Sequence, residues 1–280
     1  MEKDGSVASD SNVTTKEKTY KKLINFYKIA IDPSFIDARK TSSQVLKEYI
    51  FKAFTDKTFN LGDVIIEKIE LDENYFFGSI CRRSDLDILT EIKSATDEKS
   101  IKNADIIIES YTYFLIDLNS LSMSVIKTQK IPKSDEYIKD LILKISPLNV
   151  VIAPFIKKEE EIKSMIANSF SLTFYDNSDK YIGLKQSSLF DCEFGELTIK
   201  AKLKDNKNNK NIMKNLINVF KGNSDVKSLS ASTDSEDIDL LKSSFTKHVT
   251  IELSKDYKND LDKIRQTLAK ELSIIEAQSI

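Results

Sequence analysis

Hydrophobic positions follow two periods along the first half of the chain, which predicts strands and helices in mixed order. Residues 24–31 (INFYKIAI) are β-branched and aromatic and end at an Asp-Pro pair, as a strand does. Between residues 42 and 53, apolar side chains recur three and four positions apart after two serines, which predicts a helix with serine as its N-cap. Residues 63–82 and 105–128 each predict a hairpin, the first around an Asp-Glu-Asn turn.

The second half repeats this mixture of elements. Ser134 is expected to cap a helix that ends before Pro147. The later predictions are strands at 149–157, 170–176, 180–184, 196–204 and 247–253, helices at 159–168 and 211–221, and a long amphipathic helix from residue 255. Hairpins that alternate with single helices are typical of the α+β class, and they disfavour a doubly wound parallel sheet. We therefore predict an α+β protein with two sheet-and-helix halves, mixed or antiparallel.

Three segments are predicted from this order. Residues 1–19 contain almost nothing to bury, which predicts a disordered tail. Residues 20–146 and 147–280 are predicted to form an N-terminal and a C-terminal α+β domain, the second closed by the long helix. The break between them has no linker composition, so one continuous structure is the alternative.

Composition excludes several classes of protein. The 280 residues carry 42 Lys+Arg and 44 Asp+Glu, a net charge of −2, so nucleic-acid binding would need a local basic patch. The six glycines form no phosphate-binding motif, and one histidine with two cysteines excludes zinc fingers and a disulfide scaffold. We expect no metal, no cofactor, no catalytic residue and no membrane insertion. The absence of an apolar leader at the N-terminus favours the cytoplasm.

Lysines gather between residues 200 and 221, where Asp205 is the only acid. This basic segment contains Lys200, Lys202, Lys204, Lys207, Lys210, Lys214 and Lys221. The first three are two residues apart in a predicted strand and share one face, and the others lie on a loop and a helix. A strand, loop and helix start of this kind could follow the backbone of double-stranded DNA without reading its bases. A solvated edge in a lysine-rich chain is the alternative.

An acidic stretch follows the basic segment directly. It comprises Asp225, Asp234, Glu236, Asp237 and Asp239. These carboxylates could fold back over the lysines and compete with phosphate. An exposed polar loop over residues 222–239 is the simpler interpretation.

The long C-terminal helix carries an apolar seam that needs a partner surface. Its positions are Tyr257, Leu261, Ile264, Leu268, Leu272 and Ile275. Their spacing of three and four residues puts them on one side of the helix. The seam can cover the chain's own sheet, or it can mediate a homodimer or bind a second protein of the same system.

Catalytic residues are sparse. Glu91 and Lys93 have the E-x-K form that, with an upstream Asp72, Asp85 or Asp87, holds Mg²⁺ in some nucleases. The surrounding sequence is more polar than a buried strand allows, so a Mg²⁺-dependent nuclease is only an alternative hypothesis.

Three other groups have simpler explanations than catalysis. His248 lies within a strand pattern, and Cys192 has no histidine near it in the sequence. A Cys–His pair would need these two residues to meet in space. Arg82 and Arg83 could bind phosphate, although a surface ion pair is the usual role of such arginines.

The order of elements resembles the RexA family of phage-exclusion proteins from lambdoid prophages. The similarity lies in the central hairpin (SYTYFLIDLNSLSMSVIKT) and in the C-terminal third. There a lysine-bearing strand (ELTIKAKLK) precedes an amphipathic helix (NIMKNLINVF), and a strand (HVTIELS) precedes a lysine-rich closing helix. The match covers about half of the chain as a pattern, and it transfers no site residue.

This resemblance implies a cytoplasmic, dimeric and non-enzymatic DNA-binding protein that acts with a partner to exclude phage. The basic segment and the lack of catalytic motifs point independently in the same direction. Our prediction from the sequence is therefore a DNA-binding protein of a phage-exclusion or anti-phage system. A protein-interaction subunit that never contacts DNA is the main alternative.

Overall fold

The computed structural model describes residues 18–36, 39–83, 109–175, 196–204, 211–253 and 260–278. In these residues twelve strands form one sheet, in the order β2-β3-β4-β5-β6-β1-β12-β11-β10-β8-β9, and β7 pairs separately with β1. Helices pack on both faces of this sheet. The α+β class predicted from the sequence is thus confirmed. No described helix is both long and apolar enough to cross a lipid bilayer.

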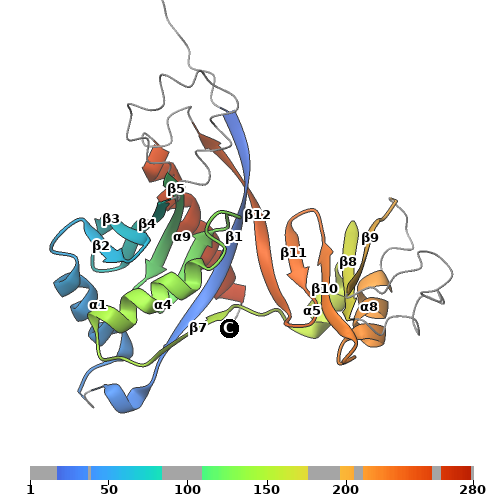
Figure 1. Ribbon diagram of the computed structural model, residues 1–280, viewed down its shortest axis with the longest axis horizontal. Helices are drawn as coiled ribbons and strands as arrows, with labels where there is room; N and C mark the ends of the chain where they lie inside the picture. The colour runs from blue at the N-terminus through green and yellow to red at the C-terminus, as the bar shows by residue number, and fades with distance from the viewer. Residues whose placement is uncertain are drawn as a thin grey trace, which may run out of the picture.

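The larger half of the sheet lies at the left of Figure 1. Its strands are β2 (Thr58–Leu61), β3 (Val64–Leu71), β4 (Tyr75–Arg83), β5 (Glu109–Asp117), β6 (Ser122–Ile126) and β7 (Val150–Pro154). The helices α1 (Ser42–Ala53) and α4 (Ser134–Ile145) cover one face through buried side chains such as Leu46 and Ile142. Aromatic rings fill this core, and Phe76 lies edge-on to Phe114 at 5.1 Å.

The smaller half lies at the right of Figure 1. Its strands are β8 (Ser169–Tyr175), β9 (Glu196–Lys202), β10 (Val226–Ser232) and β11 (Glu236–Asp239). The helices α5 (Glu159–Ser164) and α8 (Ile212–Phe220) pack on one face of these strands, where Phe220 contacts Phe174 with ring centroids 5.9 Å apart.

Two long strands join the halves. The middle residues of the strand β1 (Lys18–Ile31) pair with β6 along one edge. Along the other edge, its first half pairs with β12 (Ser244–Leu253) and its second half with β7. A 3₁₀ turn, η1 (Pro33–Phe35), follows β1, and the Asp32 side chain caps it. The sheet therefore continues from one half into the other, and a single core cluster holds residues from both.

The closing helix α9 (Leu261–Gln278) returns to the larger half. Ser124 of β6 donates a hydrogen bond to the Leu268 carbonyl at 3.2 Å, and Arg265 makes ion pairs with Glu70 at 3.0 Å and Asp72 at 2.9 Å. Both β12 and α9 fall within the predicted C-terminal domain, residues 147–280. In the structure, both elements pack against strands from residues 20–146.

Several local expectations differ from the structure. The N-cap of α1 is Thr41, not a serine, and it forms a capping box with Gln44. Ser134 does not cap α4, because the N-cap residue is Lys133. The Ser134 hydroxyl instead donates a hydrogen bond to the Ile131 carbonyl. The strand β1 begins at Lys18, so it includes the last two residues of the predicted tail, and residues 1–17 lie outside the described ones. The predicted polar loop over 222–239 is wrong, because most of it forms β10 and β11.

Candidate nucleic-acid interface

One face of the smaller half is built from small hydroxyl-bearing side chains and lysines. Side chains on adjacent strands alternate between two faces, and the register places the polar set together. We call this surface the polar sheet face, and its residues are Ser169, Ser171, Thr173, Thr198, Lys200, Lys202, Ser228, Ser230 and Ser232. The apolar residues between them, such as Leu172, Ile199 and Leu229, point to the opposite face and its core. The described helices α5 and α8 pack on that opposite face.

The two lysines on this face have serines as their cross-strand neighbours. Lys200 pairs with Ser171 and Lys202 with Ser169, so no carboxylate lies directly opposite either ammonium group. Both lysines are exposed, and neither makes an ion pair within the described part of the chain. Lys204 follows in the same alternation and is also exposed. At about 3.4 Å per residue, the three lysines are spaced roughly 6.8 Å apart along the edge strand.

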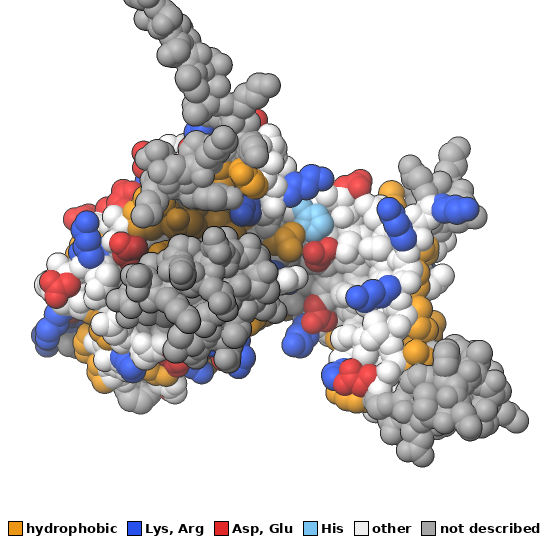
Figure 2. Space-filling model, turned by 45° about the horizontal axis from the view of Figure 1, so that its top comes forward, with side chains coloured by type: hydrophobic (Ala, Val, Ile, Leu, Met, Phe, Trp, Pro, Cys, Tyr) orange, Lys and Arg blue, Asp and Glu red, His pale blue; other side chains and the backbone are white. Residues whose placement is uncertain are grey.

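A shallow hollow of about 400 Å³ lies between these lysines and β10. Its lining includes Ser169, Ser171, Lys200, Lys202, Ser230 and Ser232. The surface to the right of the histidine in Figure 2 is mostly white, with separate basic side chains spread over it and acidic ones beside the histidine. Hydroxyl and ammonium groups are the side-chain donors that contact phosphate oxygens, so the hollow has the chemistry of a phosphate-contacting surface.

The acidic stretch lies beside the lysines and does not cover them. Asp237 and Asp239 share the polar face but are on β11, three strands away from β9, or about 14 Å at the usual strand spacing. Each has a local partner. Asp237 lies 3.2 Å from His248, and Asp239 accepts backbone hydrogen bonds from Leu241 and Lys242.

Of the three other acids, Glu236 and Asp234 have partners in other segments, and Asp225 directly precedes β10. Glu236 points to the opposite face, where it lies 3.1 Å from the buried ammonium group of Lys157. Asp234 accepts a hydrogen bond from the Asn168 side chain at 2.7 Å. The Glu236 carboxylate is therefore directed away from Lys200 and Lys202, whereas Asp234 is bonded to Asn168, which lines the same hollow as these lysines.

The structure divides the predicted basic segment between two sides of the sheet. Lys214 and Lys221 belong to α8 and its C-terminal cap, in the helical layer opposite the polar sheet face. Lys207 and Lys210 lie outside the described residues. A single strand-loop-helix surface therefore does not form from the described lysines, and the group that shares one face is Lys200, Lys202 and Lys204.

Lys221 is held in an ion pair within the helical layer. Its Nζ lies 2.7 Å from Glu159, and Lys163 contacts the same carboxylate at 2.5 Å. Hydrogen bonds from Lys163 and then Lys221 lower the pKa of Glu159 from 4.5 to about 2. The contribution of these ion pairs to the free energy of unfolding is fully present above pH 4.5, and it is lost as the pH falls toward 2.

We expect Lys221→Ala to raise the pKa of Glu159 toward its ordinary value while DNA affinity changes less than twofold. The pKa should rise only in part, because Lys163 remains. Titration of the Glu159 carboxyl carbon by NMR and a DNA-binding isotherm measure the two quantities. A loss of affinity as large as that of Lys200→Ala would show that Lys221 also contacts DNA.

The apolar seam of the closing helix packs on the chain's own sheet. Ile264, Leu268, Leu272 and Ile275 are each at most 2% exposed, and Leu261 is partly buried. Tyr257 lies outside the described residues. The seam thus covers the chain's own sheet, which is the first of the uses considered above. Formation of a homodimer and binding of a second protein remain predictions, and the seam assigns no site to either.

The residues considered for catalysis have structural partners or lie outside the described ranges. Asp72 accepts backbone hydrogen bonds from Asn74 and Tyr75 at the hairpin turn, in addition to its pair with Arg265. Arg82 pairs with Asp63 at 3.2 Å.

The other catalytic candidates belong to segments outside the described ranges. They are Asp85, Asp87, Glu91, Lys93 and Cys192, together with the side chain of Arg83. In the described residues, no three carboxylate, histidine or cysteine side chains form a metal-binding group.

Comparison with known proteins does not assign the chain to a family. No protein-family model matches it, and no curated protein has significant sequence similarity to it.

Proposed function

We propose that this protein binds double-stranded DNA through phosphate contacts made by the polar sheet face. The observation that carries this proposal is the arrangement of Lys200 and Lys202, which lie on β9 opposite serines and make no ion pair within the described residues. Lysines contribute the charge, and the serine and threonine hydroxyls contribute hydrogen bonds to phosphate oxygens. Contacts of this kind are made to the sugar-phosphate backbone, which carries no sequence information directly.

The proposed biological setting is phage exclusion or another anti-phage system. Support for it comes from the resemblance of the sequence to the RexA family, and support for DNA contact comes from the face itself. A non-enzymatic role agrees with the structural partners of Asp72 and Arg82. The alternative function, binding of another protein, would use the apolar seam of α9. That seam packs inside this chain.

Fluorescence anisotropy of a labelled 20-base-pair duplex tests this proposal. Binding should be measurable at ~50 mM salt and at least tenfold weaker at ~200 mM, because each phosphate contact releases a counterion. Duplexes of unrelated sequence should bind equally well, and Mg²⁺ should leave them uncut. Failure to bind at ~50 mM salt would rule out the proposed function, and Mg²⁺-dependent cleavage would favour a nuclease.

A further inference from the structure

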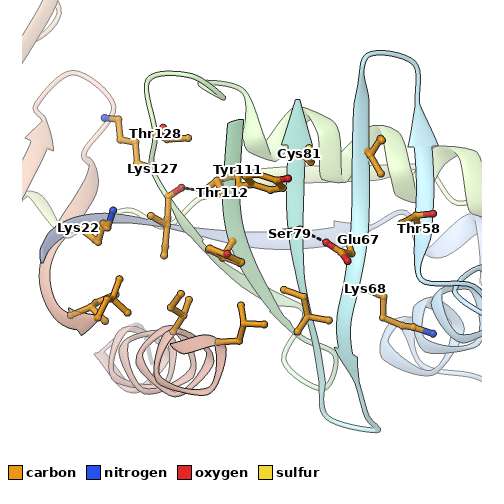
Figure 3. A pocket seen from close by; sticks show the side chains of 18 of the residues that line it. Lys22, Thr58, Glu67, Lys68, Ser79, Cys81, Tyr111, Thr112, Lys127 and Thr128 are labelled. Atoms are coloured by element: carbon orange, nitrogen blue, oxygen red, sulfur yellow. Dashed lines mark hydrogen bonds between the residues drawn. The ribbon is translucent and has the colours of Figure 1, made fainter. Parts of the chain in front are cut away.

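Two features of the sheet play no part in the proposed function, a cavity and an outer edge. The cavity has a volume of about 970 Å³ and lies on the face that α9 covers in part, where Ser79 donates a hydrogen bond to Glu67 (Figure 3). Its lining mixes lysines with apolar side chains, and Lys22, Cys81 and Tyr111 have interaction partners of their own. The cavity therefore indicates no particular ligand, whereas the outer edge of the sheet at β9 indicates a partner.

The strand β9 ends the sheet among the described strands, so half of its backbone groups have no neighbouring strand to pair with. The Leu203 N–H donates to the Asn168 carbonyl of the adjacent pair at 2.8 Å, so the odd-numbered residues of this segment direct their backbone groups toward β8. Successive residues of a strand alternate in this direction. The outward-directed residues are therefore Glu196, Thr198, Lys200 and Lys202, which we call the β9 edge.

The β9 edge is long and regular enough to accept a further strand. It spans seven residues without a proline, and its pairing with β8 contains no bulge. Unpaired edges of this kind are templates for another strand, and proteins often protect them with lysines. Lys200 and Lys202 therefore select against most strands and favour one that places acidic or neutral side chains opposite them.

A second copy of β9 meets this requirement in one antiparallel register. With a two-fold axis perpendicular to the sheet at Ile199, Lys202 lies opposite Glu196 of the second copy, and Lys200 lies opposite Thr198. All four residues are directed outward, so each opposed pair can form two N–H···O hydrogen bonds. An axis at Lys200 would oppose two lysines, and an axis at Thr198 would leave Lys202 beyond the end of the second β9.

The other side chains of β9 also match in this register. Ile199 lies opposite its own copy and Leu197 lies opposite Ala201, and all three are partly buried in the single chain. Pairing would extend the apolar side of the sheet, where Ile199 already packs against the core. Glu196 contacts Lys227 of its own chain through one carboxylate oxygen, and the other oxygen has no partner among the described residues.

We propose that two copies of this chain associate through the β9 edge, antiparallel and with the two-fold axis at Ile199. Backbone hydrogen bonds hold the two strands together, and the Glu196–Lys202 pairs fix the register. The two sheets become one, and the polar sheet faces of both copies lie on the same side of it. This inference does not depend on DNA binding by that face.

Cross-linking through a single cysteine tests the position of the axis. Opposed residues at a non-hydrogen-bonded position have Cα atoms about 4.5 Å apart, which a disulfide can span. Ile199→Cys, in a chain that also carries Cys192→Ser, should form a disulfide-linked dimer under mild oxidation, and the buried Cys81 can stay. Leu197→Cys is the matched control, because its two copies lie four residues apart along the strands, or roughly 14 Å, and should not cross-link.

Charge exchange tests the register at exposed positions. Lys202→Glu and Glu196→Lys should each weaken dimerisation about tenfold, because two-fold symmetry places two like-charged pairs in every dimer. The chain with both substitutions restores opposite charges and should dimerise within about threefold of the wild type. Lys139→Glu on α4 is the control and should have no effect on dimerisation. Sedimentation velocity over a range of protein concentrations, without DNA, measures the dissociation constant.

Three results would overturn the proposal. A wild-type chain that stays monomeric at its highest soluble concentration would leave the β9 edge to a strand of another protein. Equal cross-linking through Ile199→Cys and Leu197→Cys would contradict the axis. Failure of the combined exchange to restore dimerisation, with folding confirmed by circular dichroism, would contradict the register. The exchange variants change only exposed side chains, so they decide the proposal should Ile199→Cys fail to fold.

Discussion

Replacing Lys200 and Lys202 together by glutamate should weaken binding to double-stranded DNA by about 100-fold at ~50 mM salt. Each reversal removes a phosphate contact and adds repulsion, and about 1.4 kcal/mol for each position corresponds to a factor of ten. The fold should not change, because both side chains are exposed and lie on an edge strand. Anisotropy titrations measure the affinity, and circular dichroism checks the fold.

The matched control reverses two other exposed lysines. Lys139→Glu combined with Lys144→Glu on α4 makes the same change in net charge on a helix that covers the larger half. This variant should retain DNA affinity within about threefold, since only long-range electrostatics differ. Equal losses in both variants would mean that net charge, and not the polar sheet face, governs binding.

Replacing Leu268 by aspartate should destabilise the protein by about 4 kcal/mol or more. Leu268 is fully buried where α9 packs on the sheet, so the change leaves a cavity and places a carboxylate in an apolar site. A single domain has only about 5–15 kcal/mol of stability, so much of the variant would be unfolded at 37 °C. Urea unfolding followed by circular dichroism measures the free energy of unfolding.

The exposed neighbour Lys270 provides the comparison. Lys270→Asp should change the free energy of unfolding by no more than about 0.5 kcal/mol. The account of α9 would be wrong if Leu268→Asp kept wild-type stability and converted a dimer to a monomer. That result would mean that the seam binds a second chain.

Local patterns in the sequence are sufficient to predict many of the strands and turns. The two-residue period of ELTIKAKLK placed Lys200, Lys202 and Lys204 on one face, and the structure has them there on β9 and just after it. The Asp-Glu-Asn turn lies between β3 and β4 as expected, with Asp72 accepting the backbone hydrogen bonds of the turn. In these segments the information is local, because neighbouring residues determine a strand or a turn.

The strand β10 was missed because its signal is weak. Serines alternate with Leu229 and Ala231, so the period of two is present, but small polar side chains have low hydrophobicity and low strand propensity. The signal that identifies this strand is the two-residue period, not the hydrophobicity. For the same reason the sequence predicts a loop for the acidic residues nearby, although three of them, Glu236, Asp237 and Asp239, lie on β11.

The environments of the candidate sites could not be derived from local sequence. Serines lie opposite Lys200 and Lys202 because β8 and β9 pair in one register across the 20 residues between them. The β9 edge exists because of the order of the strands in the sheet, which no local pattern reveals. Lys214 was grouped with Lys200 by its position in the chain, but the packing of α8 places it on the other side of the sheet.

The salt dependence of DNA binding tests the central claim most directly when the wild type is compared with Lys200→Ala combined with Lys202→Ala. The slope of log K against log salt is about −0.9 for each phosphate contact, so removing two contacts should make it less steep by about 1.8. A variant that binds weakly and with this shallower slope is the result that the account predicts. A slope equal to that of the wild type would show that these lysines do not contact phosphate, and it would contradict the assignment of the polar sheet face as the DNA-binding surface.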